Sequence, residues 1–340
     1  MSPERAPFLK WAGGKRRLVP FIASAIGLAQ EPTKQAPFNS ALAPSLTGDF
    51  SGRQWKRLIE PFAGSAAVSL ALADFFDEIW LNDVNEDLMN LYVVLRESPE
   101  SYIQEVHTLF SADTNNAETY YRLRDEFNRT TSRRRRAALF LYLNRHGYNG
   151  LCRYNNDGEF NVPFGRYKRP YFPYAELMAA VDVLAKSQLT CLDFEEVMQQ
   201  AGPGDVVYCD PPYVPLSATA SFTDYAAGGF GPQDQERLAS AAEEACRRGA
   251  VVAISNHDTE WTRALYQNAE VHYTRVRRSI SANGQTRGEV REVLAVYWPD
   301  GMQGGKVGGG RTTGQSQRPS AREHSRERVP DSRLPNRTVY

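Results

Sequence analysis

Residues 58–65 read Leu58-Ile59-Glu60-Pro61-Phe62-Ala63-Gly64-Ser65, a short apolar run that turns at a glycine. Small and apolar residues follow from Ala66 to Phe76, and a second apolar run, residues 78–81, ends at Asn82-Asp83. The pattern predicts a strand, a glycine turn, a helix and a second strand. Asp83 stands 19 residues beyond Gly64. An acid at this place in a βαβ unit can accept both ribose hydroxyls of a nucleoside cofactor, so Asp83 is the predicted ribose ligand.

The competing interpretation of this unit is a dinucleotide site of the dehydrogenase type. The GxGxxG fingerprint is absent, and a single glycine, Gly64, stands in the loop. A pyrophosphate requires closer approach of the backbone than one glycine allows. S-adenosylmethionine carries no phosphate, and a sparser loop therefore suffices for it.

A second informative segment is Asp210-Pro211-Pro212-Tyr213, which follows the apolar run from Val206 to Cys209. The amino lone pair of adenine or cytosine is delocalised into the ring, so two acceptors for its N–H hydrogens favour attack on a sulfonium methyl. Asp210 and the Pro211 carbonyl are the predicted acceptors, because consecutive prolines fix φ and add no competing donor. Tyr213 is predicted to stack on a flipped base. The alternative is a proline turn that ends a strand, with the acid as a local cap.

Helical patterns separate this run from two further strand candidates, residues 251–255 and 293–298. Alternating strands and helices predict an α/β sheet with ligands at the carboxyl edge of its strands. Asn256-His257-Asp258 would lie at that same edge. Methyl transfer to a neutral amine needs little proton abstraction before the transition state. His257 is therefore predicted to have a structural or base-pocket role.

Two other segments offer contacts to a cofactor. The N-terminal run contains Trp11, the pair Gly13-Gly14 and Lys15. The tryptophan and the lysine can touch the methionine end of the cofactor, although a glycine turn with surface lysines is the simpler interpretation. Asp193 and Phe194 follow a possible strand and can bracket the cofactor adenine. A capped helix start at Asp193 is equally open.

From about Leu95 to Phe172, a helical, charged stretch and then an aromatic and basic region interrupt the α/β alternation. The central loop, residues 143–155, mixes asparagines, arginines and tyrosines with glycines. Arginine suits guanine O6 and N7, asparagine suits adenine N6 and N7, and an aromatic side chain can wedge between base pairs. Residues 160–168 continue the region and can clamp phosphates. The alternative is a hydrogen-bonded loop cluster that only braces the fold.

The chain has 340 residues, of which 41% are apolar, enough for a sizeable core. Its four cysteines form no CxxC pair and its five histidines show no ligand spacing, so neither a disulfide framework nor a metal site is predicted. No signal peptide and no apolar stretch of membrane-spanning length is evident. We therefore expect a cytoplasmic protein without membrane contact.

The formal net charge is zero, but its distribution is uneven. Residues 301–340 carry eight Lys/Arg and three Asp/Glu, which leaves the first 300 residues at −5. This basic tail has almost no apolar residue and is expected to be disordered. A second segment, at about residues 30–53, is rich in Pro, Ala and Ser and is interpreted as a flexible insertion.

Taken in order, these segments resemble the Dam family of DNA adenine-N6 methyltransferases, of the D12 class. The resemblance covers about residues 7–298 and rests on the motifs FLKWAGGK, EPFAG, LNRHGYNGLCRYN, FNVPFGRY, CDPPYVPLSATASF, ISNHDT and RRSISANG. It implies a Rossmann-like sheet of S-adenosylmethionine-dependent methyltransferases with an inserted, mainly helical target-recognition domain. It also implies methyl transfer from S-adenosylmethionine to adenine in double-stranded DNA, with GATC as the expected site and base flipping as the route. DNA binding would associate the protein with the nucleoid, and no obligate protein partner is evident.

The resemblance also assigns domains and residues. The domains are a cofactor-binding part at 1–94, a target-recognition domain at 95–172, a catalytic part at 173–300 and the basic tail at 301–340. The implied catalytic residues are Asp210, Pro211, Pro212 and Tyr213. The implied cofactor residues are Trp11, Lys15, Glu60, Phe62, Gly64, Asp83, Asp193, Phe194 and Asp210. The implied DNA-binding residues are Lys10, Tyr148, Asn149, Leu151, Arg153, Pro163, Arg166, Tyr167 and Lys168, with Arg153 as the reader of guanine and Tyr148 as the wedge.

The sequence departs from the family at Ala66, where a second glycine is usual. We expect this position to lie in the first turn of the helix, where a methyl group is harmless. Two alternative functions are a cytosine-N4 methyltransferase and a DNA-binding protein without catalysis. The first more often has Ser or Thr in place of Asp210, and the second would not require the complete set of residues for the chemistry.

Overall fold

A computed structural model of the chain describes residues 5–28, 55–216, 229–277 and 289–302. The predicted insertion at about residues 30–53 and the tail beyond Met302 lie outside the described residues. The expectations for both segments therefore remain predictions.

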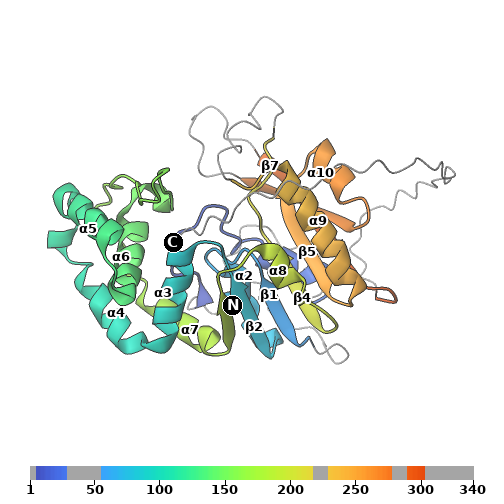
Figure 1. Cartoon of the computed structure of the whole chain (residues 1–340), viewed down its shortest axis with the longest axis horizontal. Coiled ribbons are helices and arrows are strands. Elements are labelled where there is room, and N and C mark those ends of the chain that lie inside the picture. The colour runs from blue at the N-terminus through green and yellow to red at the C-terminus, as the bar shows by residue number, and fades with distance from the viewer. Residues whose placement is uncertain (1–4, 29–54, 217–228, 278–288, 303–340) are drawn as a thin grey trace, which may run out of the picture. The chain divides into compact units, whose positions relative to one another are not determined.

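Seven strands in the described chain form one sheet, in the order β3-β2-β1-β4-β5-β7-β6 (Figure 1). Neighbouring strands are parallel from β3 to β5, whereas β7 runs antiparallel to both β5 and β6. The predicted α/β class and Rossmann-like sheet are confirmed. The strands are β1 (Arg57–Glu60), β2 (Glu78–Asn82), β3 (Ser187–Thr190), β4 (Asp205–Cys209), β5 (Val251–His257), β6 (Glu270–Arg277) and β7 (Glu289–Tyr297).

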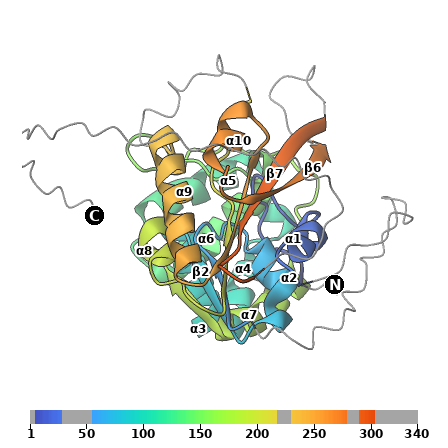
Figure 2. The ribbon, with the colours of Figure 1, turned by 90° about the vertical axis from the view of Figure 1, so that its right-hand side faces the viewer.

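Side chains of the sheet alternate between two apolar cores, one on each face. Leu58 and Ile79 face the core shared with α1 (Val19–Ala25) and α2 (Ala67–Leu72). Ile59 and Trp80 face the core shared with α8 (Phe194–Met198) and α9 (Pro232–Arg247). Figure 2 shows these two pairs of helices on opposite sides of the sheet. Burial on both faces explains why the central strands are continuous apolar runs rather than alternating ones.

The chain between β2 and β3 is mainly helical, as predicted. Each of three helices begins with a side chain that accepts a backbone N–H: Asn85, Asn116 and Ser132. Residues 137–144 of α6 (Arg133–His146) are all buried, which places α6 at the centre of the group of helices. The helices are α3 (Glu86–Glu97), α4 (Pro99–Thr108), α5 (Ala117–Arg129), α6 (Arg133–His146) and α7 (Tyr174–Ala185).

Short elements complete the fold. The helix predicted from Ala66 to Phe76 is α2 followed by the 3₁₀ turn η2 (Ala73–Phe75). The others are η3 (Ala112–Thr114), η4 (Tyr148–Gly150) and α10 (Glu260–Leu265). The strand β6 was not predicted from the sequence. Among the described strands it pairs with β7 alone, and it mixes charged with apolar residues, as edge strands do.

Candidate active site

The loops after β1, β2 and β4 meet at the carboxyl edge of the sheet. β1 and β4 are adjacent and parallel, yet β2 lies beside β1 and β5 lies beside β4, so the strand order switches between them. Such a switch opens a crevice outside the strand ends, where α/β proteins bind ligands. Glu60 ends β1, Asp83 follows β2 and Asp210 follows β4. The structure therefore brings three predicted site acids to one edge.

Gly64 shapes the loop that follows β1. Its φ is +46°, a left-handed conformation that favours glycine. A Cβ added there would lie 2.6 Å from Nε1 of Trp11, so the indole packs directly against the glycine. The Gly64 carbonyl accepts a hydrogen bond of 2.6 Å from the buried Tyr92 hydroxyl. The N-terminal segment that carries Trp11 therefore lies directly beside the loop that follows β1.

Asp83 joins this loop to the end of β2. Its Oδ2 accepts from the Gly64 N–H at 2.9 Å, and its Oδ1 accepts from the Asn85 N–H at 3.0 Å. Burial raises the pKa of Asp83, and these two hydrogen bonds oppose the rise. Each carboxylate oxygen has a second lone pair, so both can still accept a ligand hydroxyl.

The expectation for Ala66 was wrong. Ala66 is the residue before α2, and its φ of +53° and ψ of +33° are left-handed, not those of a first helical turn. An alanine in this conformation costs about 1 kcal/mol relative to glycine. Its methyl group is buried in the core on the α1 and α2 face, which offsets part of that cost.

Glu60 is buried at the start of the same loop. Its Oε1 accepts the backbone N–H of Ser69 in the first turn of α2, at 2.7 Å. Burial, with a smaller contribution from the nearby Asp210, raises the pKa of Glu60 to about 8, although hydrogen bonding from Ser69 opposes the rise. Glu60 is therefore mainly protonated at neutral pH in the ligand-free protein.

The proline loop after β4 carries a buried ion pair. Nζ of Lys15 lies 2.9 Å from Oδ1 of Asp210, donates to the Gly13 carbonyl at 2.7 Å and lies 4.8 Å from the centre of the Tyr213 ring. Burial raises the pKa of Asp210, and Lys15 opposes that rise. The prediction placed Lys15 on a cofactor carboxylate, and in the structure its ammonium group pairs with Asp210.

Tyr213 and His257 pack together beside this ion pair, with ring centres 4.8 Å apart in an edge-to-face arrangement. Nδ1 of His257 lies 2.6 Å from the Val214 carbonyl, and because a carbonyl only accepts, this nitrogen carries the proton. The Tyr213 hydroxyl donates to Oε2 of Glu292 at 3.3 Å. This contact ties His257 to the proline loop, and its structural or base-pocket role stays a prediction.

Three phenylalanines cluster at the ends of β1 and β3. Phe62 and Phe194 stack with ring centres 5.4 Å apart, and Phe230, which the sequence had not singled out, lies 5.5 Å from Phe62. Asp193 caps α8 by accepting the Glu195 N–H at 2.9 Å, and it also pairs with Arg237. The cap, one of the two interpretations left open for Asp193, is therefore present.

The predicted DNA-binding residues lie mainly around η4. Nζ of Lys10 lies 3.8 Å from the centre of the Tyr167 ring, and the Tyr167 hydroxyl accepts the Asn149 N–H at 3.0 Å. The Tyr148 N–H donates to the Pro163 carbonyl at 2.9 Å, while the Tyr148 side chain is 51% exposed. Burial, together with the nearby Arg145, lowers the pKa of Lys10 to about 8.

Four other predicted DNA-binding residues lie outside the contacts that join Lys10, Tyr167 and Asn149. Arg153 is exposed and its Nε donates to Oδ1 of Asn161 at 2.7 Å, across the turn closed by the bridge between Tyr154 and Phe160. Leu151 packs partly against the core, so only a part of it is available to a ligand. Arg166 and Lys168 are exposed.

Several buried polar residues were missed in the sequence. The amide of Asn82 donates to the carbonyls of Pro61 and Leu192, at 3.0 and 2.9 Å, and thereby ties the loops after β1 and β3 together. The only local signal for Asn82 is its place directly before Asp83. Gln235 of α9 was also missed, and it contacts the proline loop together with Asn256 of β5, which had been predicted to lie at this edge.

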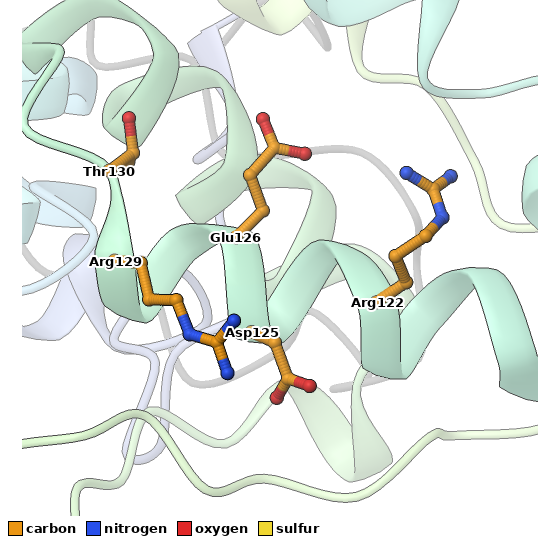
Figure 3. Close-up of a pocket in the computed structure, with 5 residues that line it drawn as sticks. All are labelled: Arg122, Asp125, Glu126, Arg129 and Thr130. Carbon is orange, nitrogen blue, oxygen red and sulfur yellow. The ribbon is translucent and has the colours of Figure 1, made fainter.

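A polar pocket of 660 Å³ lies elsewhere, on α5 (Figure 3). It is lined by Arg122, Asp125, Glu126, Arg129 and Thr130 and contains none of the predicted site residues. The described residues include no cluster of His, Cys, Asp or Glu arranged to hold a metal ion. No helix among them has the length and apolar character needed to cross a membrane.

Comparison with known proteins identifies the family. The sequence model for the D12 class of N6 adenine-specific DNA methyltransferases matches residues 40–280. This chain belongs to the D12 class. The D12 protein described here is thus an adenine-specific DNA methyltransferase, and the resemblance inferred from its motifs is confirmed.

Curated relatives match this D12 methyltransferase over nearly their whole length. The DNA adenine methylase of Escherichia coli K12 is 46% identical over 299 residues, which are 88% of this chain and 97% of the relative. That of Vibrio cholerae O1 is 41% identical over 300 residues, 88% of this chain and 98% of the relative. The family description specifies adenine, so the cytosine-N4 alternative loses its support.

Proposed function

We propose that this D12 methyltransferase transfers the methyl group of S-adenosylmethionine to N6 of an adenine that is flipped out of double-stranded DNA, within GATC. The observation that carries the proposal is that two loops lie together at the carboxyl edge of the sheet. One is the loop of Gly64 held by Asp83, and the other is the proline loop with its Lys15–Asp210 ion pair.

The residues at this edge suit the chemistry of the proposed cofactor. S-adenosylmethionine supplies an electrophilic methyl group on a positively charged sulfur. Asp83 offers two carboxylate oxygens to ribose hydroxyls. Trp11 packs so closely against Gly64 that no side chain would fit at position 64. Asp210 adds an acidic group that favours a cation, and a bound sulfonium would in turn favour the ionised form of the nearby Glu60. Phe62, only half-buried, offers ring surface to the adenine of the cofactor.

The proline loop then supplies the acceptors for the target amine. Lys15 fixes the carboxylate of Asp210, and Pro211 and Pro212 stiffen the backbone that presents the Pro211 carbonyl. Together they accept the two N6 hydrogens and favour a pyramidal nitrogen. Tyr213 stacks on the flipped base, and the catalytic contribution comes mainly from position and electrostatics.

The surface around η4 reads the DNA. Tyr148, half exposed, fills the place left by the flipped adenine. Arg153 donates to guanine O6 and N7, a contact for which it gives up its hydrogen bond to Asn161. Lys10, Asn149, Leu151, Pro163 and Tyr167 complete the recognition surface, and Arg166 and Lys168 contact phosphates.

The decisive experiment is transfer of labelled methyl from S-adenosylmethionine to two duplexes that differ only in having GATC or GTTC, followed by nucleoside analysis. We expect label in N6-methyladenine on the GATC duplex alone. Label on both duplexes would overturn the GATC specificity, and label on neither would favour the DNA-binding protein without catalysis.

The role of Asp210 has its own test. Asp210→Ala should abolish methyl transfer and leave duplex binding within a few-fold of wild type, because Asp210 acts on the amine and not on the groove. The control Glu236→Ala removes an exposed acid of α9 and should leave the rate unchanged. Full activity of Asp210→Ala would refute the assignment.

A further inference from the structure

The backbone of the proline loop has few groups that can anchor it. Pro211 and Pro212 have no N–H, so the loop cannot be held by donors at these two positions. Three backbone groups that flank Tyr213 are held instead: the Pro212 carbonyl and the N–H and carbonyl of Val214. Buried side chains from outside the loop bind all three.

Gln235 binds the first of these groups. This residue lies in α9, is 2% exposed, and donates from Nε2 to the Pro212 carbonyl at 2.7 Å. Its Oε1 accepts from Nδ2 of Asn256 at 3.0 Å, and Oδ1 of Asn256 accepts the Val214 N–H at 3.1 Å. The two amides thus form a bridge between backbone groups on either side of Tyr213.

The backbone groups that Gln235 and Asn256 bind fix the orientation of both side-chain amides. The Pro212 carbonyl can only accept and the Val214 N–H can only donate, so Gln235 must face the loop with its nitrogen and Asn256 with its oxygen. The second Nδ2 hydrogen of Asn256 goes to the Tyr266 hydroxyl at 3.0 Å. The bridge is therefore satisfied in one arrangement only, which makes it a rigid support.

We propose that Gln235 is a positioning residue for methyl transfer, which holds the Pro212 carbonyl so that the adjacent Pro211 carbonyl stays where it accepts the target amine. The inference rests on the proposed function of the proline loop. Gln235 itself touches neither substrate nor cofactor. Its loss would let the loop shift, and a displacement of about 1 Å at reacting groups can slow a reaction about 100-fold.

The test uses single-turnover methyl transfer to GATC duplex by the full-length protein, together with duplex affinity and thermal unfolding. Gln235→Leu should slow transfer about 10- to 100-fold while duplex affinity stays within about 2-fold of wild type. The matched control is Gln233→Leu, at an exposed position of the same helix, which should transfer at the wild-type rate.

Gln235→Glu separates positioning from folding. A protonated carboxylic acid can donate to the Pro212 carbonyl, whereas a carboxylate cannot and also repels that oxygen. We expect the ratio of the Gln235→Glu rate to the wild-type rate to rise as the pH is lowered from 8.5 to 6. If Gln235→Leu proves unstable, this ratio alone decides.

Each outcome has one meaning. A wild-type rate for Gln235→Leu, or a pH-independent ratio for Gln235→Glu, would overturn the positioning role while leaving the proposed function standing. Failure of wild-type protein to methylate adenine in GATC would instead overturn the proposed function, on which this inference rests.

Discussion

At Gly64 the backbone and the packing each require glycine. Gly64→Ala should lower the free energy of unfolding by clearly more than the roughly 1 kcal/mol of a left-handed alanine, because its Cβ would also collide with Trp11. It should also weaken S-adenosylmethionine binding measured by calorimetry. Gly158→Ala is the matched control, since Gly158 has φ +76° but open space around it, and urea unfolding should show only the backbone cost. Equal losses for both variants would contradict the packing argument.

The buried Glu60 makes stability depend on pH. Its folded pKa of about 8 lies above the ordinary value of 4.5, so between these pH values the folded protein holds a proton that the unfolded chain releases. Stability is therefore lost as the pH rises through this window. Glu60→Gln keeps the oxygen that accepts the Ser69 N–H and removes the titration. Urea unfolding of both proteins, without added ligand, gives the free energy of unfolding at pH 5 and at pH 8. The value for Glu60→Gln minus that for wild type should be about 2 to 5 kcal/mol larger at pH 8 than at pH 5. A constant difference would refute the raised pKa.

At the scale of elements, Asp87 joins α3 to both α6 and the loop that carries Tyr154. It pairs with Arg136 of α6 and accepts the Tyr154 hydroxyl at 2.7 Å. Tyr154→Phe should cost about 1.5 to 3 kcal/mol in urea unfolding, because it removes a buried hydrogen bond to a charged group. Tyr171→Phe removes an exposed hydroxyl that binds Glu176 and should change stability by under about 0.5 kcal/mol. Similar values for the two variants would show that Tyr154 does not tie these elements together.

At the scale of the whole molecule, the excess of positive charge lies in the tail, residues 301–340. Residues 301–340 carry eight Lys/Arg against three Asp/Glu, while the preceding residues are net acidic. Full-length protein should show a steeper fall of log duplex affinity with log salt than a chain ending at Asp300, because more counterions are released. Fluorescence anisotropy across a salt series measures both slopes. Equal slopes would mean that the tail makes no contact with DNA.

The strands could be predicted from the sequence wherever both faces are buried. β1, β2, β4 and β5 each contain an uninterrupted apolar stretch, and the candidate site acids Asp83 and Asp210 come directly after β2 and β4. β6 could not be predicted, because an edge strand lacks that pattern. Ala66 was misjudged for a different reason: a left-handed φ depends on how the loop closes over Asp83 and Trp11, which no local residue pattern encodes.

The sequence by itself determined the α/β class, because apolar runs and turn residues encode it locally, and the family, because its motifs resemble those of the D12 class. It also singled out Gly64, Asp83 and Asp210 as candidate site residues, from their places directly after strand candidates. Only the tertiary structure decided which groups meet. It placed Lys15 on Asp210, Tyr154 on Asp87 and Gln235 under the Pro212 carbonyl. These partners are far apart in the chain, and their contacts depend on strand order and helix placement, so no spacing in the sequence reveals them.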